Sequence, residues 1–425
     1  MKRYIITGAG GHLGSTLLRM LKDRDVEVCA LLLPQEKAAV QADNIRYVRG
    51  DVCRPDTLEA LFTRADIAHE ADIAYKAMGQ VPSEEVIVIH GAGIISISRH
   101  VTAPVYEVNV NGTKNMIDMS IKHHVDRFVY VGSVHAIPEL LAGRKIEEAE
   151  EFSPDLVVGA YAKTKAEATQ AVLDAVKDGL PAVVVQPSGI IGPYDKGNNH
   201  LVQMVRDYMQ GRITVCVKGG YDFVDVRDVA QGCLLAAEKG RTGRCYILSG
   251  KYCTIRDLLS SVGKPYGKKP LPVIPLFLAR LAAPVNELIA KWRGKRPLYT
   301  AYSLYTLTSN SNFSNKRAMR ELGYCARPLE ETIRDTAAWN RPSGEKPAQK
   351  ESSRSKLSGN RAAWNKSSWN RPAGNRAAWN KSSWSRPAGD RATGSKSAWS
   401  KSSGNRTVGS KSSWSKAAGN KSVIS

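Results

Sequence analysis

The chain has 425 residues, a formal net charge of +21 at pH 7 and 42% hydrophobic residues, which is enough to bury a sizeable core. Its seven cysteines are odd in number and scattered, and none stands in a Cys-x-x-Cys pair. This pattern excludes a disulfide framework, and no metal site is expected. The first apolar strand begins at residue 2 and leaves no room for a signal peptide, so a cytoplasmic protein is expected.

The N-terminal segment has the pattern of a strand, a glycine turn and a helix. Residues 2–7 form a short apolar run, residues 8–14 read Gly-Ala-Gly-Gly-His-Leu-Gly, and residues 15–21 have the apolar spacing of a helix. Glycines let backbone N–H groups approach a pyrophosphate closely, and a helix N-terminus favours negative charge. This order therefore predicts a nucleotide-binding turn at Gly8, Gly11 and Gly14.

Beyond this turn, short apolar runs alternate with amphipathic stretches. Such alternation is typical of an α/β fold with a doubly wound parallel sheet and helices between the strands. The runs that we expect to form strands lie at residues 26–33, 45–49, 86–90, 128–132 and 182–186.

Polar residues follow these expected strands at their carboxyl ends, where open α/β sheets bind ligands. Asn109 opens a helix expected to run through Ile121, and Ser133 ends a strand. Tyr161 and Lys165 are four residues apart, so that they share one face of a helix and can work as an acid/base pair.

Together these segments resemble the extended short-chain dehydrogenase/reductases, a group of nicotinamide-dependent epimerases, dehydratases and reductases. The resemblance covers about residues 1–338. It implies a Rossmann-type domain at residues 1–186 and a smaller substrate-binding lobe at residues 187–338, which also returns to the Rossmann sheet. The matching segments are residues 7–14, Asp51 with Val52, residues 89–92, residues 109–113, Ser133, Tyr161 with Lys165, residues 186–193 and residues 223–230.

The resemblance also implies the catalytic roles. Tyr161 would be the general acid/base, giving a proton to a carbonyl oxygen as hydride arrives from the nicotinamide, or removing it in the reverse direction. Because free tyrosine has a pKa of about 10, an adjacent cation is needed to favour the phenolate near neutrality. Lys165 would supply that charge and bind the nicotinamide ribose. Ser133 would hold the substrate oxygen, the alternative being a strand-end hydroxyl satisfied by backbone.

Cofactor contacts follow from the same resemblance. Asp51 and Val52 match the family's adenine contact, although a carboxylate near a helix N-cap is the alternative for Asp51. His135 lies on the substrate side and either contacts substrate or is structural. The residues expected to bind cofactor are Gly8, Gly11, His12, Leu13, Gly14, Asp51, Val52, Ala92, Asn109, Tyr161, Lys165, Pro187 and Ser188.

The choice between NAD and NADP is poorly specified. The second strand ends at Leu33 and continues into Pro34 and Gln35, without the acidic residue that would take the ribose 2′-hydroxyl of NAD. Glu36 comes late for that role, and Lys37 could approach a 2′-phosphate. We therefore expect NAD or NADP, with a slight preference for NADP.

Within the family, the sequence favours simple carbonyl/alcohol redox on a small, apolar substrate. Nucleotide-sugar dehydratases carry an Asp-Glu pair after the active-site hydroxyl, whereas Ser133 is followed by Val-His-Ala. Residues 186–189 are closer to the dihydroflavonol-reductase-like and hydroxysteroid-dehydrogenase-like branches than to the epimerases. A nucleotide-sugar epimerase and a cofactor-binding scaffold stay open as alternatives. Relatives often form homodimers through the helices that carry Asn109 and Tyr161.

Two segments carry less information. Residues 270–289 are apolar and rich in proline, so that a membrane-spanning helix is not expected. They are expected to line an apolar pocket or pack on the core, with membrane-surface contact as the lesser alternative. Residues 64–85 are longer than the usual connection and form a loop or an added helix. Their His69, Glu70 and Asp72 are expected to be solvated.

The composition changes after residue 338. The last 87 residues follow an imperfect five-residue repeat, hold a net charge of +15 and contain seven of the eight tryptophans. A period of five matches neither helix nor strand, and the segment is poor in core-forming residues, so we expect a disordered tail. Basic and aromatic residues together could bind nucleic acid or another anionic surface. The alternative is a tail without a role, produced by expansion of a tandem repeat.

Overall fold

A seven-stranded parallel sheet forms the centre of the protein. The computed structural model describes residues 1–63, 84–141, 143–197, 199–281 and 301–341. The strand order is β10-β6-β5-β4-β1-β2-β3, so the direction of winding reverses between β1 and β4. All neighbouring pairs are parallel. The strands are β1 (Lys2–Thr7), β2 (Glu27–Leu32), β3 (Ile45–Arg49), β4 (Glu85–His90), β5 (Arg127–Val131), β6 (Ala182–Pro187) and β10 (Cys245–Leu248).

The five strands expected from the apolar runs are confirmed, each within one residue of its expected ends. Their residues are rich in Val and Ile because a parallel sheet is covered on both faces and buries both sets of side chains. This confirms the expected doubly wound α/β fold. It also places the point where the winding reverses, between β1 and β4, beside the glycine turn that follows β1.

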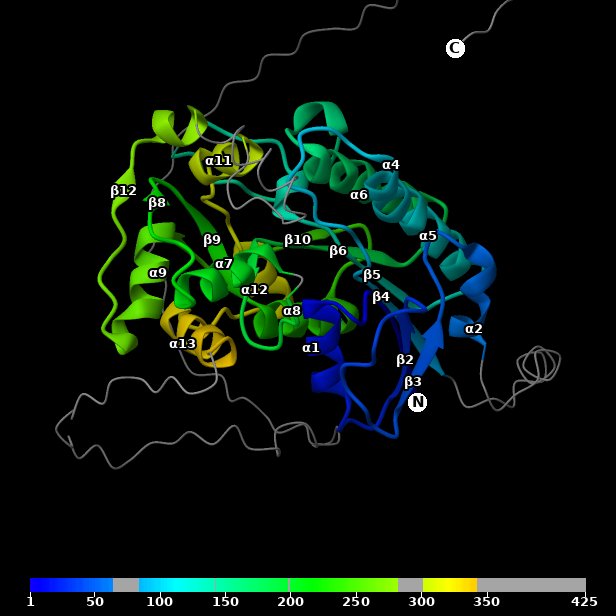
Figure 1. The fold of residues 1–425 in the computed structure, drawn as a ribbon. Helices are drawn as coiled ribbons and strands as arrows, with labels where there is room; N and C mark the ends of the chain where they lie inside the picture. Colours follow the sequence, from blue (N-terminus) through cyan, green and yellow to red (C-terminus); the bar gives the residue numbers. More distant parts are fainter. Residues whose placement is uncertain (64–83, 142, 198, 282–300, 342–425) are drawn as a thin grey trace, which may run out of the picture. The chain divides into compact units, whose positions relative to one another are not determined.

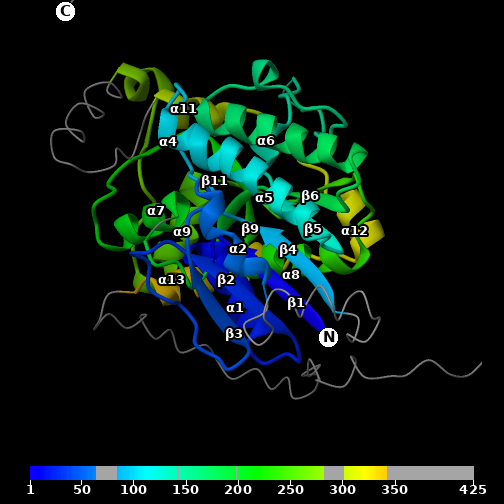
Figure 2. The ribbon, with the colours of Figure 1, turned by 90° about the vertical axis from the view of Figure 1, so that its right-hand side faces the viewer.

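Helices cover both faces of the sheet, and each face has its own hydrophobic core. The α5 and α6 helices lie over one face and α1 and α8 over the other, as Figure 1 shows. Figure 2 shows α5 and α6 running beside each other above β4, β5 and β6. These helices and the shorter ones around them are α1 (His12–Leu21), η1 (Pro55–Thr57), α2 (Glu59–Phe62), α5 (Gly112–Lys122), η3 (Val134–Ala136), η4 (Pro154–Leu156), α6 (Ala160–Lys177), α8 (Val226–Lys239) and α12 (Lys316–Leu322).

The smaller lobe is built around a third core of its own. In its three-stranded sheet, the central strand β9 is parallel to β7 and antiparallel to β11. A two-stranded pair, β8 with β12, lies beside it. Its elements are β7 (Gly189–Ile191), α7 (His200–Met209), β8 (Cys216–Val217), β9 (Gly220–Asp225), β11 (Lys251–Thr254), α9 (Ile255–Gly263), η5 (Lys264–Tyr266), β12 (Val273–Ile274), α11 (Ala301–Thr308) and α13 (Leu329–Trp339).

The helix expected to open at Asn109 begins earlier. Helical structure starts with α4 (Ala103–Tyr106), continues through a π-helical turn at η2 (Glu107–Asn111) and runs on into α5. Pro104 lies in the first turn of α4, where its missing N–H costs nothing. Asn109 therefore lies inside a π turn, a distortion that is frequent at functional sites.

The folded part of the chain extends past the expected boundary at residue 338. Trp339 is the last residue of α13, and its indole N–H donates to the carbonyl oxygen of Asp195. Asn340 is buried, and its Oδ1 accepts two hydrogen bonds from the guanidinium of Arg206. The tail beyond residue 341 lies outside the described residues, as do His69, Glu70 and Asp72.

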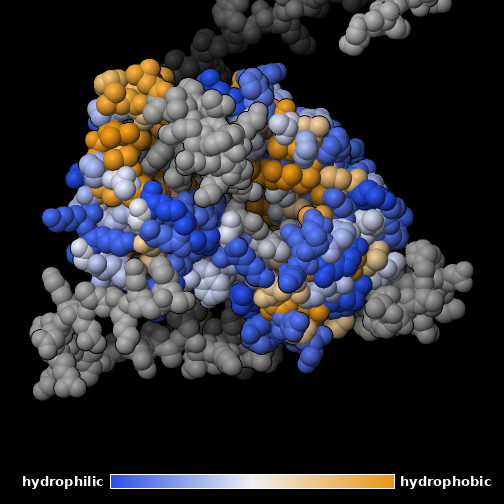
Figure 3. Space-filling model, in the orientation of Figure 1, coloured by the Kyte–Doolittle hydropathy of each residue, from blue (hydrophilic) through white to orange (hydrophobic). Residues whose placement is uncertain are grey.

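The apolar segment at residues 270–289 is described up to residue 281. Ala279 packs in the core of the smaller lobe, whereas Phe277 and Leu281 are 62% and 72% exposed. Figure 3 shows hydrophobic surface over this lobe, at the upper left. The described half of the segment thus contributes both to the core and to an apolar surface.

Candidate active site

The glycine turn after β1 is so tight that side chains would not fit. Gly8 has a φ of +70°, in the left-handed region that favours glycine. A Cβ on Gly14 would lie 2.2 Å from the carbonyl oxygen of Gly8, and one on Gly8 would lie 2.7 Å from that of Gly91. The turn leads directly into the N-terminus of α1. These residues fit the pyrophosphate of a dinucleotide, which binds where backbone N–H groups and a helix N-terminus meet.

His12 connects this turn to the smaller lobe. Its Nε2 lies 2.7 Å from the carbonyl oxygen of Pro193, and its Nδ1 lies 3.1 Å from Nδ2 of Asn199. Asn199 also caps α7, since its Oδ1 accepts from the backbone N–H groups of residues 201 and 202. Burial is the largest influence on the imidazole and lowers the pKa of His12. Neutral His12, with its proton on Nε2, satisfies both partners, so its side chain serves the lobe contact. Leu13 packs partly against the core behind α1.

The expected adenine contact and the expected cofactor-binding residue Ala92 lie in the loops after β3 and β4. Asp51 accepts the backbone N–H of Cys53 at 2.9 Å and so forms a local turn. Val52 is buried, and a Cβ on Gly112 would lie 2.7 Å from its methyl carbon. The backbone N–H of Ala92 donates to Oγ1 of Thr7. Both loops follow the carboxyl ends of strands on the edge of the sheet that carries the glycine turn; β4 is next to β1, and β3 is separated from it by β2.

Ser133 and Tyr161 meet at the end of β5. Ser133 is buried, and its Oγ caps η3 by accepting the N–H of His135. Its hydroxyl lies near enough to the phenol of Tyr161 to act on the pKa of that group. Burial raises the pKa of Tyr161 to about 12, against a smaller lowering by the Ser133 hydroxyl. The Ser133 hydroxyl thus accepts a backbone N–H, as the structural alternative requires, and it also lies beside the tyrosine. The phenol is protonated at neutral pH, as an acid needs to be.

His135 and Tyr302 surround this pair. The ring of His135 meets that of Tyr161 edge-on at 6.3 Å, and burial lowers the pKa of His135 to about 4. Tyr302, on α11 of the smaller lobe, lies over Gly159 so closely that a Cβ there would be 2.1 Å from its ring. The smaller lobe therefore reaches the start of α6, and Tyr302 is a neighbour of the site that the sequence analysis missed.

Lys165 is buried one turn along α6 from Tyr161. Its Nζ donates to the carbonyl oxygen of Val131 at 2.7 Å and to the hydroxyl of Tyr130 at 3.3 Å. Burial lowers the pKa of Lys165 to about 7. The expected lowering of the Tyr161 pKa by this cation is not found, since burial governs both groups and moves their pKa values toward the neutral forms.

Asn109 holds the loop after β4 against α6. Its Oδ1 accepts the N–H of Ile94 at 2.7 Å, and its Nδ2 donates to the carbonyl oxygen of Ile94 and to Oγ1 of Thr164. A Cβ on Gly93, in the same loop, would lie 3.2 Å from Asn109 Oδ1 and 3.6 Å from Lys165 Nζ. Asn109 thus supports the backbone beside Lys165.

A buried hydrogen-bond chain beneath the site was also missed. Thr113 donates to the carbonyl oxygen of Asn109 and therefore accepts from Nε2 of His90 at 3.0 Å. Nδ1 of His90 then accepts from the hydroxyl of Thr7 at 2.7 Å. The Thr7 hydroxyl in turn accepts from the backbone N–H of Ala92. This order fixes His90 as the neutral Nε2–H form. The chain ties β1, β4 and α5 together; the only signal in the sequence is the histidine before Gly91.

Pro187 is the last residue of β6 and Ser188 follows it, at the carboxyl edge of the sheet near which Ser133 lies. Ser188 donates a 2.6 Å hydrogen bond to Oδ1 of Asp222, a buried carboxyl group whose pKa is raised to about 6 by burial. The hydroxyl of Ser188 is therefore engaged within the protein, so that a cofactor contact at this position would use its backbone.

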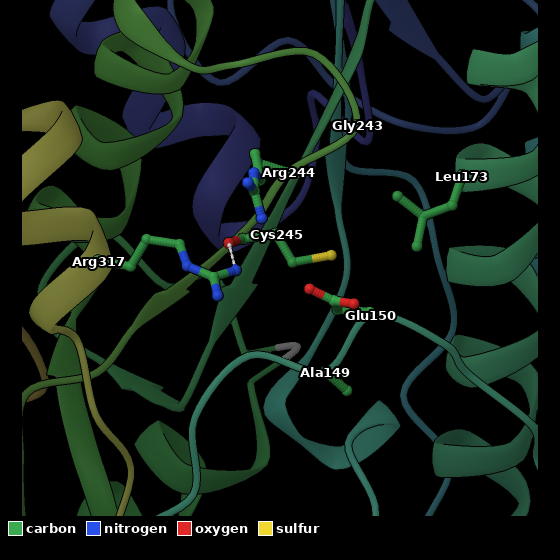
Figure 4. A pocket seen from close by; sticks show the side chains of 7 residues that line it. All are labelled: Ala149, Glu150, Leu173, Gly243, Arg244, Cys245 and Arg317. Carbon is green, nitrogen blue, oxygen red and sulfur yellow. Dashed lines mark hydrogen bonds between the residues drawn. The ribbon is translucent and has the colours of Figure 1, made fainter. Parts of the chain in front are cut away.

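A separate hollow of about 150 Å³ lies at the opposite edge of the sheet. Figure 4 shows Arg317, which donates to the carbonyl oxygen of Cys245, together with Arg244 and Glu150 around it. Cys245 is the first residue of β10, whereas Ser133 follows the last residue of β5. The hollow thus lies at the other edge of the sheet from Ser133, Tyr161 and Lys165.

A glycine turn at the switch point of a doubly wound sheet, followed by a serine, a tyrosine and a lysine around one strand end, defines a nucleotide-dependent oxidoreductase. Residues 4–248 match the sequence profile described as the NAD dependent epimerase/dehydratase family. The chain belongs to this family, and it is an enzyme of the extended short-chain dehydrogenase/reductase type. The resemblance inferred from the motifs is thereby confirmed.

Similar proteins include both reductases and epimerases. A putative dihydroflavonol 4-reductase from Synechocystis is 26% identical over 79% of this chain and 94% of its own length. A 4-hydroxy-2-methyl-3-oxo-4-farnesyl-3,4-dihydroquinoline-1-oxide ketoreductase from Stigmatella aurantiaca is 30% identical over 81% of this chain and 98% of its own length. The structure of UDP-glucose 4-epimerase from Thermotoga maritima has a TM-score of 0.61 at 20% identity, covers 80% of this chain and 98% of its own, and supports the fold alone. Within the described residues, no helix combines the length and apolarity needed to cross a bilayer.

Proposed function

We propose that the chain interconverts a carbonyl and an alcohol on a small, apolar substrate, with Tyr161 as the general acid/base. The observation that carries this proposal is the placement of the Ser133 hydroxyl beside the phenol of Tyr161 at the end of β5. When bound, the nicotinamide supplies or accepts hydride at the carbonyl carbon. Tyr161 gives its proton to the carbonyl oxygen in reduction, while Ser133 donates to the same oxygen.

The raised pKa of Tyr161 suits its proposed role as proton donor in the reduction. A phenol with a pKa of about 12 stays protonated at neutral pH, and it gives up its proton only to a strongly basic oxygen, such as an alkoxide formed by hydride addition. Lys165, held by Val131, is placed one turn away to bind the ribose of the nicotinamide. Asn109 and the loop that it holds keep Lys165 in this position.

Apolar side chains near the catalytic residues support an apolar substrate. Ile94 and Ile95 are 37% and 53% exposed in the loop that Asn109 holds, and Val158 is 44% exposed just before α6. Exposed apolar groups beside a reactive centre are typical of sites for apolar ligands. The names of the dihydroflavonol reductase and of the ketoreductase for a farnesyl-bearing ketone agree with such a substrate.

A panel of apolar ketones tests this function. With NADH or NADPH, the purified protein is expected to oxidise one equivalent of reduced cofactor per ketone reduced. Ser133→Ala should lower this turnover by about 100-fold or more. Ser153→Ala is the matched control, because Ser153 caps η4 through the same kind of bond and stands outside the site. Tightly retained NAD without net ketone reduction would instead indicate a nucleotide-sugar epimerase.

For the tail, binding to nucleic acid is proposed as a separate property. Its net charge of +15 and its regularly spaced tryptophans supply phosphate neutralisation and base stacking. Fluorescence anisotropy with single-stranded oligonucleotides should show salt-sensitive binding by the whole chain and loss of binding in a chain that ends at residue 341. Equal binding by both chains would contradict this property and leave the enzyme proposal intact.

A further inference from the structure

The chain after β2 folds back on itself. The N–H of Glu36 donates to the carbonyl oxygen of Leu33 at 3.0 Å, which closes a four-residue turn with Pro34 in its second position. Proline is favoured there because its fixed φ suits the turn. The turn reverses the chain directly after the strand, so that Glu36 returns to the carboxyl end of β2 rather than continuing away from it.

The side chain of Glu36 then lies against the glycine turn. Its Oε2 accepts the backbone N–H of Leu33 at 3.1 Å. A Cβ on Gly10 would lie 2.8 Å from Cδ and from Oε1 of Glu36. Gly10 stands between Gly8 and Gly11 of the phosphate-binding turn, so the carboxylate is in contact with the turn itself. Glycine at position 10 leaves the room that this contact needs.

Arg49 fixes the turn in place. Arg49 is the last residue of β3 and pairs with Leu32 in the sheet. Its Nη1 donates to the carbonyl oxygen of Leu33 at 3.0 Å and also to that of Glu36. The turn is therefore held from both sides, by its own backbone bond and by the neighbouring strand. Lys37, directly after it, is exposed.

From this placement we propose that Glu36 binds the adenosine ribose and makes the enzyme select NAD over NADP. In dinucleotide-binding folds, an acidic residue about 20 residues after the glycine motif accepts hydrogen bonds from the ribose hydroxyls. Glu36 lies 22 residues after Gly14. A 2′-phosphate would instead place its negative charge against the carboxylate, where like charges repel. This inference replaces the slight preference for NADP that Lys37 suggested, and it rests on the proposed function only in that a dinucleotide binds the glycine turn.

Titration calorimetry of the whole chain with NADH and with NADPH tests the inference. We expect NADH to bind at least about tenfold more tightly, since a charged hydrogen bond is gained with one nucleotide and lost with the other. Glu36→Gln should reduce this ratio about tenfold, mostly through tighter binding of NADPH. Glu36→Asp keeps the charge and should retain part of the preference. Glu27→Gln, at the other end of β2, makes the same change of charge and should leave the ratio unchanged.

Lys37→Gln distinguishes Glu36 from Lys37 as the residue that sets the preference between NADH and NADPH. If Glu36 sets the preference, Lys37→Gln leaves the ratio of affinities unchanged. Tighter binding of NADPH than of NADH by the whole chain, or an unchanged ratio in Glu36→Gln, would overturn the inference. Failure of the proposed function gives a different result, namely NADH binding with the expected preference but no reduction of any ketone.

Discussion

Lys165 Nζ donates a 2.7 Å hydrogen bond to the carbonyl oxygen of Val131, the last residue of β5. Lys165 is therefore anchored to the strand that leads to Ser133, two residues further along the chain. Through this bond, α6 and β5 place Ser133, Tyr161 and Lys165 relative to one another before any substrate binds. Such preorganisation of the reacting groups is a main source of catalytic power.

Binding of NADH should weaken as the pH rises through about 7. Burial lowers the pKa of Lys165 to about 7, so the folded protein loses the ammonium above that pH. An ammonium donates stronger hydrogen bonds to ribose hydroxyls than an amine does. Calorimetry between pH 6 and 8.5 should show this decrease in the affinity for NADH in the parent protein and no decrease in Lys165→Met. Lys163→Met, on the same helix, is the control and should retain it.

Removal of the Thr113 hydroxyl should destabilise the protein more than removal of the Thr169 hydroxyl. Thr113→Val leaves the buried Nε2–H of His90 without its acceptor, and an unsatisfied buried donor costs about 1–3 kcal/mol. Thr169 is equally buried and bonds the carbonyl oxygen four residues before it, as Thr113 does, with no histidine in the bond. Urea unfolding should therefore give a greater loss for Thr113→Val than for Thr169→Val. Equal losses would show that the hydrogen bonds through His90 add nothing to the stability of the protein.

Stability should fall as the pH drops below about 6.5. Burial lowers the pKa of His90 to about 3 and that of His135 to about 4. An unfolded histidine titrates near 6.5, so between these values the unfolded chain binds more protons than the folded one, and acid favours unfolding. The free energy of unfolding should decline from pH 6.5 to 4, less steeply in His90→Gln than in the exposed control His100→Gln. Parallel declines in both variants would exclude His90 as a source.

The end of the folded part can be located by two truncations. A chain that ends at residue 341 keeps the bonds of Trp339 to Asp195 and of Asn340 to Arg206, whereas one that ends at 338 loses both. The second chain should be less stable by about 1–3 kcal/mol, since it loses the hydrogen bond of Trp339 to Asp195 and those of Asn340 to the partly buried guanidinium of Arg206. Thermal unfolding compares the two. Identical midpoints would show that the fold is complete at residue 338.

Much of the fold could be predicted from local patterns in the sequence. The glycine turn, five strands, and the strand-end or helix positions of Ser133, Asn109, Tyr161 and Lys165 could all be predicted, because each depends on short-range periodicity or on a motif. The position of the Glu36 side chain could not, since the residue comes four positions after the end of β2 and only a turn brings it back to the strand end. The hydrogen bonds through His90 and the contact of Trp339 with Asp195 join segments that are distant in sequence, and only the folded structure shows them.

The most direct test of the central proposal is a single-turnover reduction by Tyr161→Phe, with NADH and a ketone that the parent enzyme reduces. The substitution removes one proton donor and leaves the ring in place. We expect hydride transfer to slow by a factor of about 10² to 10⁴, with the dissociation constant for NADH nearly unchanged. Hydride transfer at the parent rate would contradict the assignment of Tyr161 as the general acid.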